Sequence, residues 1–126
     1  MTRRVRIGTP EDFPDGTLVT VDAGGTGVIV ARDGETLCAA RNRCPHVGLS
    51  LTSGPGGTHF ADGVVQCPWH NSRFTLCSGE NLDWTPGIAG REMPKWSQRA
   101  LSLGRKPAPL TTYPVVVEDG VVYVEL

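Results

Sequence analysis

The chain has 126 residues, of which 39% are hydrophobic, and its formal net charge is −1. This length and composition suit one domain with one core, and the small net charge excludes a global field that attracts nucleic acid or an anionic membrane. The longest aliphatic run, residues 28–31, is far shorter than the roughly 20 residues of a membrane helix. Residues 1–6 carry charge with no apolar stretch behind them, unlike a secretory signal. We therefore expect a soluble cytoplasmic protein.

Short β-branched runs, separated by many of the 16 glycines and 10 prolines, follow one another along the chain. The first predicted strands cover residues 17–21, 27–32 and 36–40, with a hairpin turn at Asp33-Gly34 between the last two. Strands at 64–66 and 73–76 flank a Cys/His pair, and residues 113–117 and 121–125 form a closing hairpin. The pattern predicts an all-β domain of antiparallel strands.

One segment departs from this pattern and predicts a short helix over residues 93–104. Pro94 stands near its start, a glycine ends it, and Trp96, Ala100 and Leu103 recur at helical spacing. We place this helix in an insertion, residues 88–106, whose five basic residues and one acidic residue give a charge of five minus one, or +4. Such a charge suits docking of an acidic partner, but we favour a solvated helix that packs Trp96 and Leu103 on the barrel.

Two short motifs carry the chemistry: Cys44-Pro45-His46, and Cys67-Pro68-Trp69-His70 after 20 intervening residues. Each offers one thiolate and one imidazole within a single loop, and together they supply four ligands. A [2Fe–2S] core needs two terminal ligands on each iron, which these residues provide if the thiolates bind one iron and the imidazoles the other. Two thiolates and two neutral histidines leave the oxidised site uncharged, so it accepts an electron more easily than a four-thiolate site.

Zinc is the alternative metal, since tetrahedral Cys₂His₂ sites are common. Zinc fingers usually group a cysteine pair before a histidine pair, whereas these pairs are interleaved, which favours the iron–sulfur cluster. The four cysteines also allow disulfides, but without a secretion signal we expect none, because cytosolic disulfides are rare. We interpret Cys38 as a small buried hydrophobe, Cys77 as a buried residue or unbonded thiol, and His59 as a surface-loop histidine.

The sequence resembles the Rieske ferredoxins, small electron carriers of bacterial aromatic-ring-hydroxylating dioxygenase and related monooxygenase systems. The resemblance covers nearly the whole chain, and its most specific part is the pair of ligand motifs; further matching segments are residues 47–49, 71–74, 78–80 and 113–124.

The resemblance implies a single Rieske domain over residues 1–126, with antiparallel sheets and a cluster-binding subdomain at 41–87. It implies that Cys44, His46, Cys67 and His70 bind a Rieske-type [2Fe–2S] cluster, with both histidines near solvent. Residues 85–87 match a proline-containing loop that covers the cluster in this family.

As a carrier, the chain would not be an enzyme. The resemblance implies a flavoprotein or iron–sulfur reductase and a terminal oxygenase as partners, and we expect a monomer in isolation.

Departures from the wider family affect the expected potential. High-potential Rieske proteins carry two further cysteines where this chain has Leu49 and Trp69, and a tyrosine where it has Phe74; Ser72 remains a candidate donor to the cluster. Fewer hydrogen bonds to sulfur lower the potential, so we expect the lower part of the roughly −150 to +300 mV Rieske range. Asn71 replaces a commoner glycine, and asparagine tolerates positive φ.

Two other functions remain open. One is the small Rieske-like subunit of a nitrite reductase, and the other is a structural zinc module. A terminal oxygenase is excluded for this chain alone, because its mononuclear iron site typically needs two histidines and a carboxylate, and only His59 is left.

Overall fold

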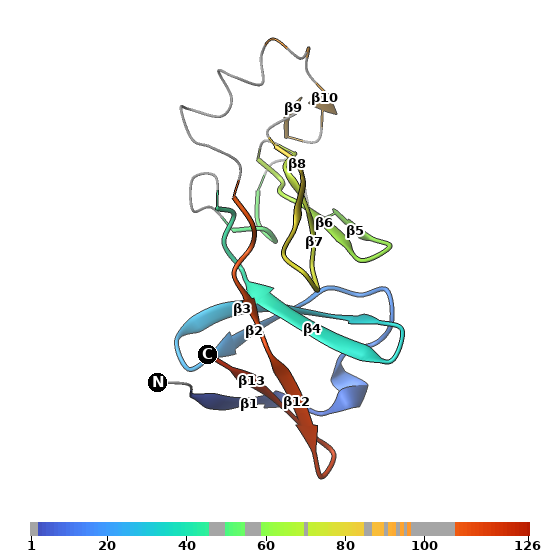
Figure 1. The fold of residues 1–126 in the computed structure, drawn as a ribbon, viewed down its shortest axis with the longest axis vertical. Coiled ribbons are helices and arrows are strands. Elements are labelled where there is room, and N and C mark those ends of the chain that lie inside the picture. The colour runs from blue at the N-terminus through green and yellow to red at the C-terminus, as the bar shows by residue number, and fades with distance from the viewer. Residues whose placement is uncertain are drawn as a thin grey trace.

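The computed structural model describes residues 3–45, 50–54, 59–69, 71–84, 87–89, 91–92, 94, 96 and 108–126. In this part of the chain the strands form four sheets in which every pairing is antiparallel. Figure 1 shows the sheets distributed between two stacked regions, which we call the base and the tip.

The base contains two sheets. One has the order β1-β13-β12 and the other the order β11-β4-β3-β2. Their bounds are β1 Arg4–Gly8, β2 Val19–Ala23, β3 Thr26–Asp33, β4 Thr36–Arg41, β11 Thr112–Tyr113, β12 Val115–Glu118 and β13 Val121–Glu125. A 3₁₀ turn, η1 (Pro10–Asp12), joins β1 to the second sheet. Its Pro10 and Phe13 carbonyls accept hydrogen bonds from the Arg32 guanidinium, at 2.8 and 3.0 Å.

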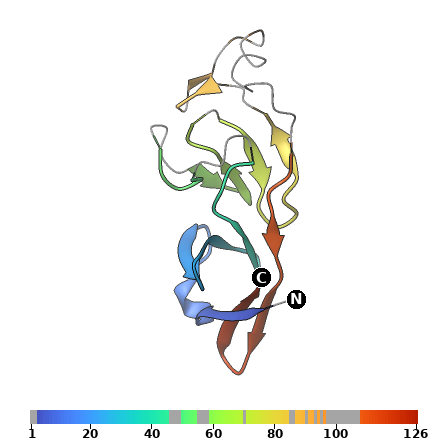
Figure 2. The same cartoon turned by 90° about the vertical axis from the view of Figure 1, so that its left-hand side faces the viewer.

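The tip contains the remaining sheets, one four-stranded with the order β5-β6-β7-β8 and one formed by the hairpin β9-β10. Their bounds are β5 His59–Ala61, β6 Val64–Gln66, β7 Arg73–Thr75, β8 Asn81–Asp83, β9 Gly87–Ile88 and β10 Arg91–Glu92. Figures 1 and 2 both place β9–β10 at the end of the tip remote from the base.

Strand β3 shows how the tip packs on the base. Side chains alternate between the faces of a strand. Val28 and Val30 point into a core between the two base sheets, whereas Ile29 and Ala31 point into a second core shared with the tip. The four-stranded base sheet is therefore covered on both faces, which makes it the platform that carries the tip.

The predicted hairpins of the base are confirmed. Strands β3 and β4 pair across Gly34 and Glu35, one residue later than predicted, because Asp33 ends β3 opposite Thr36. Strand β12 pairs with β13 across Asp119 and Gly120, whereas Tyr113, predicted as the start of that strand, belongs to β11 and pairs with β4. Asp119 and Gly120 have φ values of 51° and 73°, and positive φ at both central residues is typical of a type I′ turn.

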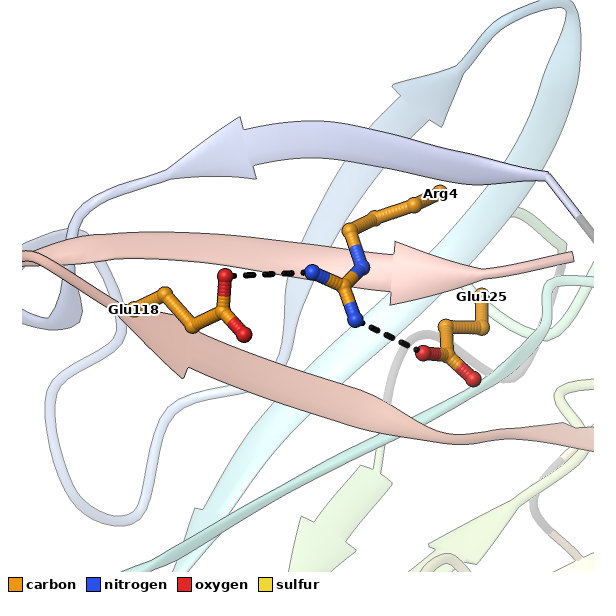
Figure 3. A network of polar contacts seen from close by, with 3 residues as sticks. All are labelled: Arg4, Glu118 and Glu125. Atoms are coloured by element: carbon orange, nitrogen blue, oxygen red, sulfur yellow. Dashed lines mark hydrogen bonds and ion pairs between the residues drawn. The ribbon is translucent and has the colours of Figure 1, made fainter.

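Strand β1 was not predicted, because residues 1–6 were treated only as a charged stretch. Its charged side chains lie on the outer face, while Val5 and Ile7 pack on the core of the base. Arg4 illustrates that outer face in Figure 3: its guanidinium reaches Glu118 at 3.1 Å and Glu125 at 3.3 Å. The hydrogen bond with Glu125 and the charge of Glu118 raise the pKa of Arg4 above its usual value.

The insertion differs in part from expectation. The predicted helix over residues 93–104 lies outside the described residues, apart from Pro94 and Trp96. The expected packing of Trp96 is wrong, because its side chain is 78% exposed. The insertion also opens with a hairpin that was not predicted, since Ile88, Arg91 and Glu92 belong to β9 and β10.

A disulfide joins the base to the tip, which corrects the interpretation of two cysteines. Cys38 on β4 bonds Cys77 in the turn after β7, with 5.0 Å between their Cα atoms. The expectation that the chain forms no disulfide is therefore wrong for this pair. That expectation used compartment alone, whereas the fold brings together residues separated by 39 positions.

The described residues include no helix long and apolar enough to cross a membrane.

Candidate metal centre

Cys44 and Cys67 reach the same core from different loops. Cys44 follows β4 and is 0% exposed, while Cys67 follows β6 and is 2% exposed. Both belong to the core shared by base and tip, and neither takes part in a disulfide. The fold thus brings together the two thiols that the sequence predicts as ligands. His46 and His70, the other two predicted ligands, lie outside the described residues.

Asn42 joins the two ends of the first ligand loop, residues 43–50. The Asn42 carboxamide oxygen accepts the Leu51 N–H at 2.9 Å, and its nitrogen donates to the Thr52 hydroxyl at 2.9 Å. The Asn42 N–H donates to the Gly27 carbonyl at 2.9 Å, which attaches Asn42 to β3. The side chain of Asn42, two residues before Cys44, therefore joins the chain before the loop to the chain after it. Sequence reasoning missed this residue, because a lone asparagine carries no local signal.

The second ligand loop is the turn between β6 and β7. The Cys67 N–H donates to the Ser72 carbonyl at 2.7 Å, and the Asn71 N–H donates to the Cys67 carbonyl at 3.1 Å. Asn71 has φ of 62°, which confirms the expectation that it supplies the positive φ of this turn. Cys67 is thus held by two backbone hydrogen bonds as the chain reverses direction.

Trp69 links the two ligand loops. Its indole N–H donates to the Ser53 carbonyl at 3.0 Å, just beyond the first loop. Gly54 is adjacent, and a Cβ there would lie 2.7 Å from the Trp69 indole nitrogen. The half-buried ring also packs on the shared core. These contacts show that Trp69 fills the space between the two loops and adds a hydrogen bond that joins the second ligand loop to the segment after the first.

The setting of the two thiols is apolar. The core around them contains Leu51, Val65, Phe74, Leu76 and Trp84. Ser72 and Phe74 are both 0% exposed. Phe74 has no hydroxyl. Ser72 is the buried hydroxyl-bearing residue nearest in sequence to Cys67. Water is excluded from this side of the site, which raises the strength of any electrostatic interaction made there.

The remaining predicted features are placed as follows. His59 lies on strand β5 opposite Gln66, not in a loop, and is exposed. Thr85 and Pro86 of the predicted covering loop lie outside the described residues, and Gly87 begins β9. Within the described ranges no three His, Cys, Asp or Glu residues cluster as a metal site.

Comparison with known proteins relates the chain to an iron–sulfur family. A family model described as "Rieske [2Fe-2S] domain" matches residues 3–113. The 3-phenylpropionate/cinnamic acid dioxygenase ferredoxin subunit of Photorhabdus laumondii is 33% identical over 119 residues, which cover 92% of this chain and 88% of that protein. The corresponding subunit of Escherichia coli K12 is 31% identical over 117 residues, with 91% and 86% coverage.

Longer proteins also match. Mouse and human apoptosis-inducing factor 3 are 31% identical over 78 residues, or 62% of this chain, which span 12% of their own length. Among solved structures, the ferredoxin of carbazole 1,9a-dioxygenase from Nocardioides aromaticivorans IC177 has a TM-score of 0.68 at 24% identity, covering 96% of this chain and 95% of that one. This structural similarity supports the fold.

The two described donors are thiols, the ligand type that iron–sulfur clusters require. Two thiols in one apolar core, each from its own loop, match a site in which sulfur ligands bind one iron. A tetrahedral zinc finger would instead place a cysteine pair on one local segment. The chemistry of the donor set and the family match therefore agree.

Proposed function

Because this chain belongs to the Rieske [2Fe–2S] domain family, we propose that it is a one-electron carrier that passes electrons from a reductase to a terminal oxygenase. Its cofactor is a Rieske-type [2Fe–2S] cluster, which supplies reversible one-electron transfer when bound. The ferredoxin names of the two relatives that cover most of the chain support the carrier function. The same relatives give no support to the alternative of a nitrite reductase subunit.

We assign Cys44 and Cys67 to one iron and His46 and His70 to the other. The observation that carries this assignment is the convergence of the two cysteines, buried and outside any disulfide, from separate loops into one core. The histidines are assigned from their place in the two motifs.

The protein's own residues would then perform three tasks. Asn42 and the turn around Cys67 hold the thiols in place before the metal arrives, which lowers the ordering cost of binding. Leu51, Val65 and Phe74 exclude water from the thiol side. The absence of a hydroxyl on Phe74 leaves fewer donors toward sulfur, so we propose a potential in the lower part of the Rieske range.

We propose one domain over residues 1–126, with the cluster-binding subdomain at 41–87 and the insertion at 88–106. A flavoprotein or iron–sulfur reductase and a ring-hydroxylating oxygenase are the proposed partners, and the isolated protein is proposed to be a monomer that is not itself an enzyme. We propose the cytoplasm as its compartment, where reducing conditions keep the cluster thiols available for iron and where the Cys38–Cys77 bond has to resist reduction. Cell fractionation, together with alkylation of thiols in intact cells before lysis to measure Cys38–Cys77 oxidation, tests that location.

The first experiment is visible absorption of the purified protein, followed by EPR after dithionite reduction. A red-brown protein with two irons per chain and the low average g-value of a mixed Cys/His cluster is expected. Transfer is then measured by mixing the reduced protein with an oxidised dioxygenase and following reoxidation. A colourless protein with one zinc per chain, after anaerobic production with iron supplied, would overturn the proposal.

A further inference from the structure

The second ligand loop is tied to the hairpin β9–β10 of the insertion. Two hydrogen bonds cross between them: the Ala89 N–H donates to the Trp69 carbonyl at 2.9 Å, and the Asn71 side-chain amide donates to the Arg91 carbonyl at 2.9 Å. One bond involves the middle of the hairpin and the other its second strand. The hairpin is thus bonded to Trp69 and Asn71 of the second ligand loop, and Figures 1 and 2 place the hairpin at the far end of the tip.

Asn71 does more here than supply a positive φ. Glycine would adopt φ of 62° at lower cost, but it has no side chain to reach Arg91. Asn71 is 3% exposed, and its hydrogen bond to the Arg91 carbonyl is part-buried, so its amide has little access to water as an alternative partner. A buried amide that lost this partner would be costly, which makes the contact strongly preferred.

Gly87 shows how closely the hairpin approaches Asn71. A Cβ atom at Gly87 would collide with the Arg91 carbonyl oxygen and with the Asn71 side-chain nitrogen. No side chain fits between these groups, so the hairpin, the Asn71 amide and the loop behind it form one packed unit. The Asn71 N–H in turn donates to the Cys67 carbonyl, which connects this unit to a thiol of the site.

We propose that Asn71 is a positioning residue for the cluster: its side-chain amide holds the second ligand loop against the β9–β10 hairpin, and so sets the retention and the electronic properties of the cluster. The inference rests on the proposed assignment of Cys67 and His70 as ligands. It gives the start of the insertion a function, as the support of a ligand loop.

The test is Asn71→Gly, which allows the positive φ and removes the side chain that reaches Arg91. Cluster loss to an iron chelator is expected to be about fivefold faster, as for one lost hydrogen bond. The reduction potential and the EPR g-values are expected to shift, because the loop that carries two ligands changes its position; a purely structural role would leave both unchanged.

Asn81→Ala is the matched control. The Asn81 amide also donates to a backbone carbonyl, that of Arg73 at 3.2 Å, but it lies on β8. Gly87→Ala approaches the same contact from the hairpin side and should reproduce the effects of Asn71→Gly. The double variant should lose its cluster more slowly than the product of the two single effects predicts, because both changes disrupt one contact.

The outcomes separate this inference from the proposed function. Wild-type protein without a cluster would overturn both. A loaded wild type with Asn71→Gly unchanged in chelation rate, potential and g-values would overturn the inference alone, as would an equal effect of Asn81→Ala. If Asn71→Gly assembles no cluster, Gly87→Ala is judged by the same readouts, and a result equal to wild type would overturn the inference.

Discussion

The base and the tip of this protein are stabilised in different ways. Apart from β11, the strands of the base have four to eight residues, and the core between its sheets is mainly aliphatic. The strands of the tip have two or three residues. Short ladders contribute few backbone hydrogen bonds, so the tip depends on particular side chains such as Asn42, Trp69 and Asn71.

The difference shows how the fold carries a metal centre. We expect the base, with its longer ladders, to fold without the metal, and the tip of short strands to gain part of its stability from metal binding. We therefore expect loss of the cluster to affect the tip and leave the base folded. The predictions below test this division, from the largest expected effect to the smallest.

Replacing a ligand thiol should empty the site. Cys44→Ser or Cys67→Ser is expected to reduce iron affinity by more than the roughly 10–100-fold cost of losing an outer partner. Iron content and visible absorption measure the loss, and far-UV circular dichroism should retain the β signal of the base. The control Cys38→Ser/Cys77→Ser should keep its colour. Full iron content in either ligand variant would refute the assignment.

Truncating the base core should destabilise the protein without changing the cluster. Phe13 is 0% exposed in the core of the base, and Phe13→Ala is expected to cost about 3–5 kcal/mol of unfolding free energy. Urea unfolding measures this cost, while the EPR spectrum of the folded protein should match wild type. An altered EPR spectrum would mean that the base and tip are not separable as described.

Opening the Cys38–Cys77 disulfide should loosen the connection between base and tip. The bond closes a loop of 39 residues in sequence separation that contains all four proposed ligands, and its removal is expected to cost up to about 4 kcal/mol. Urea unfolding of Cys38→Ser/Cys77→Ser, compared with oxidised wild type, measures the cost. Equal stability of the two proteins would show that the other contacts at this junction are sufficient.

Removing the indole donor of Trp69 should weaken the link between the ligand loops. Trp69→Phe keeps an aromatic ring against the core but loses the hydrogen bond to Ser53, which contributes about 1 kcal/mol net. Faster cluster loss to a chelator is expected, with a fall in the free energy of unfolding by urea of no more than about 1 kcal/mol. An unchanged chelation rate would assign Trp69 to gap filling alone.

The smallest effect is expected for the exposed charges of the base. Arg4 bridges Glu118 and Glu125 on the surface, where solvent and salt screen the interaction. Arg4→Ala should lower Tm by less than any variant above, and the difference should disappear at high salt. A salt-independent loss would show that the contact of the Arg4 guanidinium with the Tyr123 ring, 5.7 Å from the ring centroid, matters more than the two ion pairs.

Several features could be predicted from the sequence because they depend on neighbouring residues. The turns that contain Gly34 and Asp119-Gly120 follow from the positive φ that these residues adopt. The two Cys/His motifs predict a cluster because each loop supplies one ligand of each type within three or four residues. Alternating β-branched residues predicted most strands of the base for the same local reason.

The sequence by itself therefore determined the β class and the turns of this protein, and it predicted the ligands of the cluster. Only the tertiary structure decided the Cys38–Cys77 bond, the pairing of β1 with β13, and the contact between Asn71 and the Arg91 carbonyl. Each of these joins residues at least 20 positions apart, and no local pattern records which distant segments meet. These contacts form because folding packs segments that are distant in sequence against one another, and that packing depends on the whole chain.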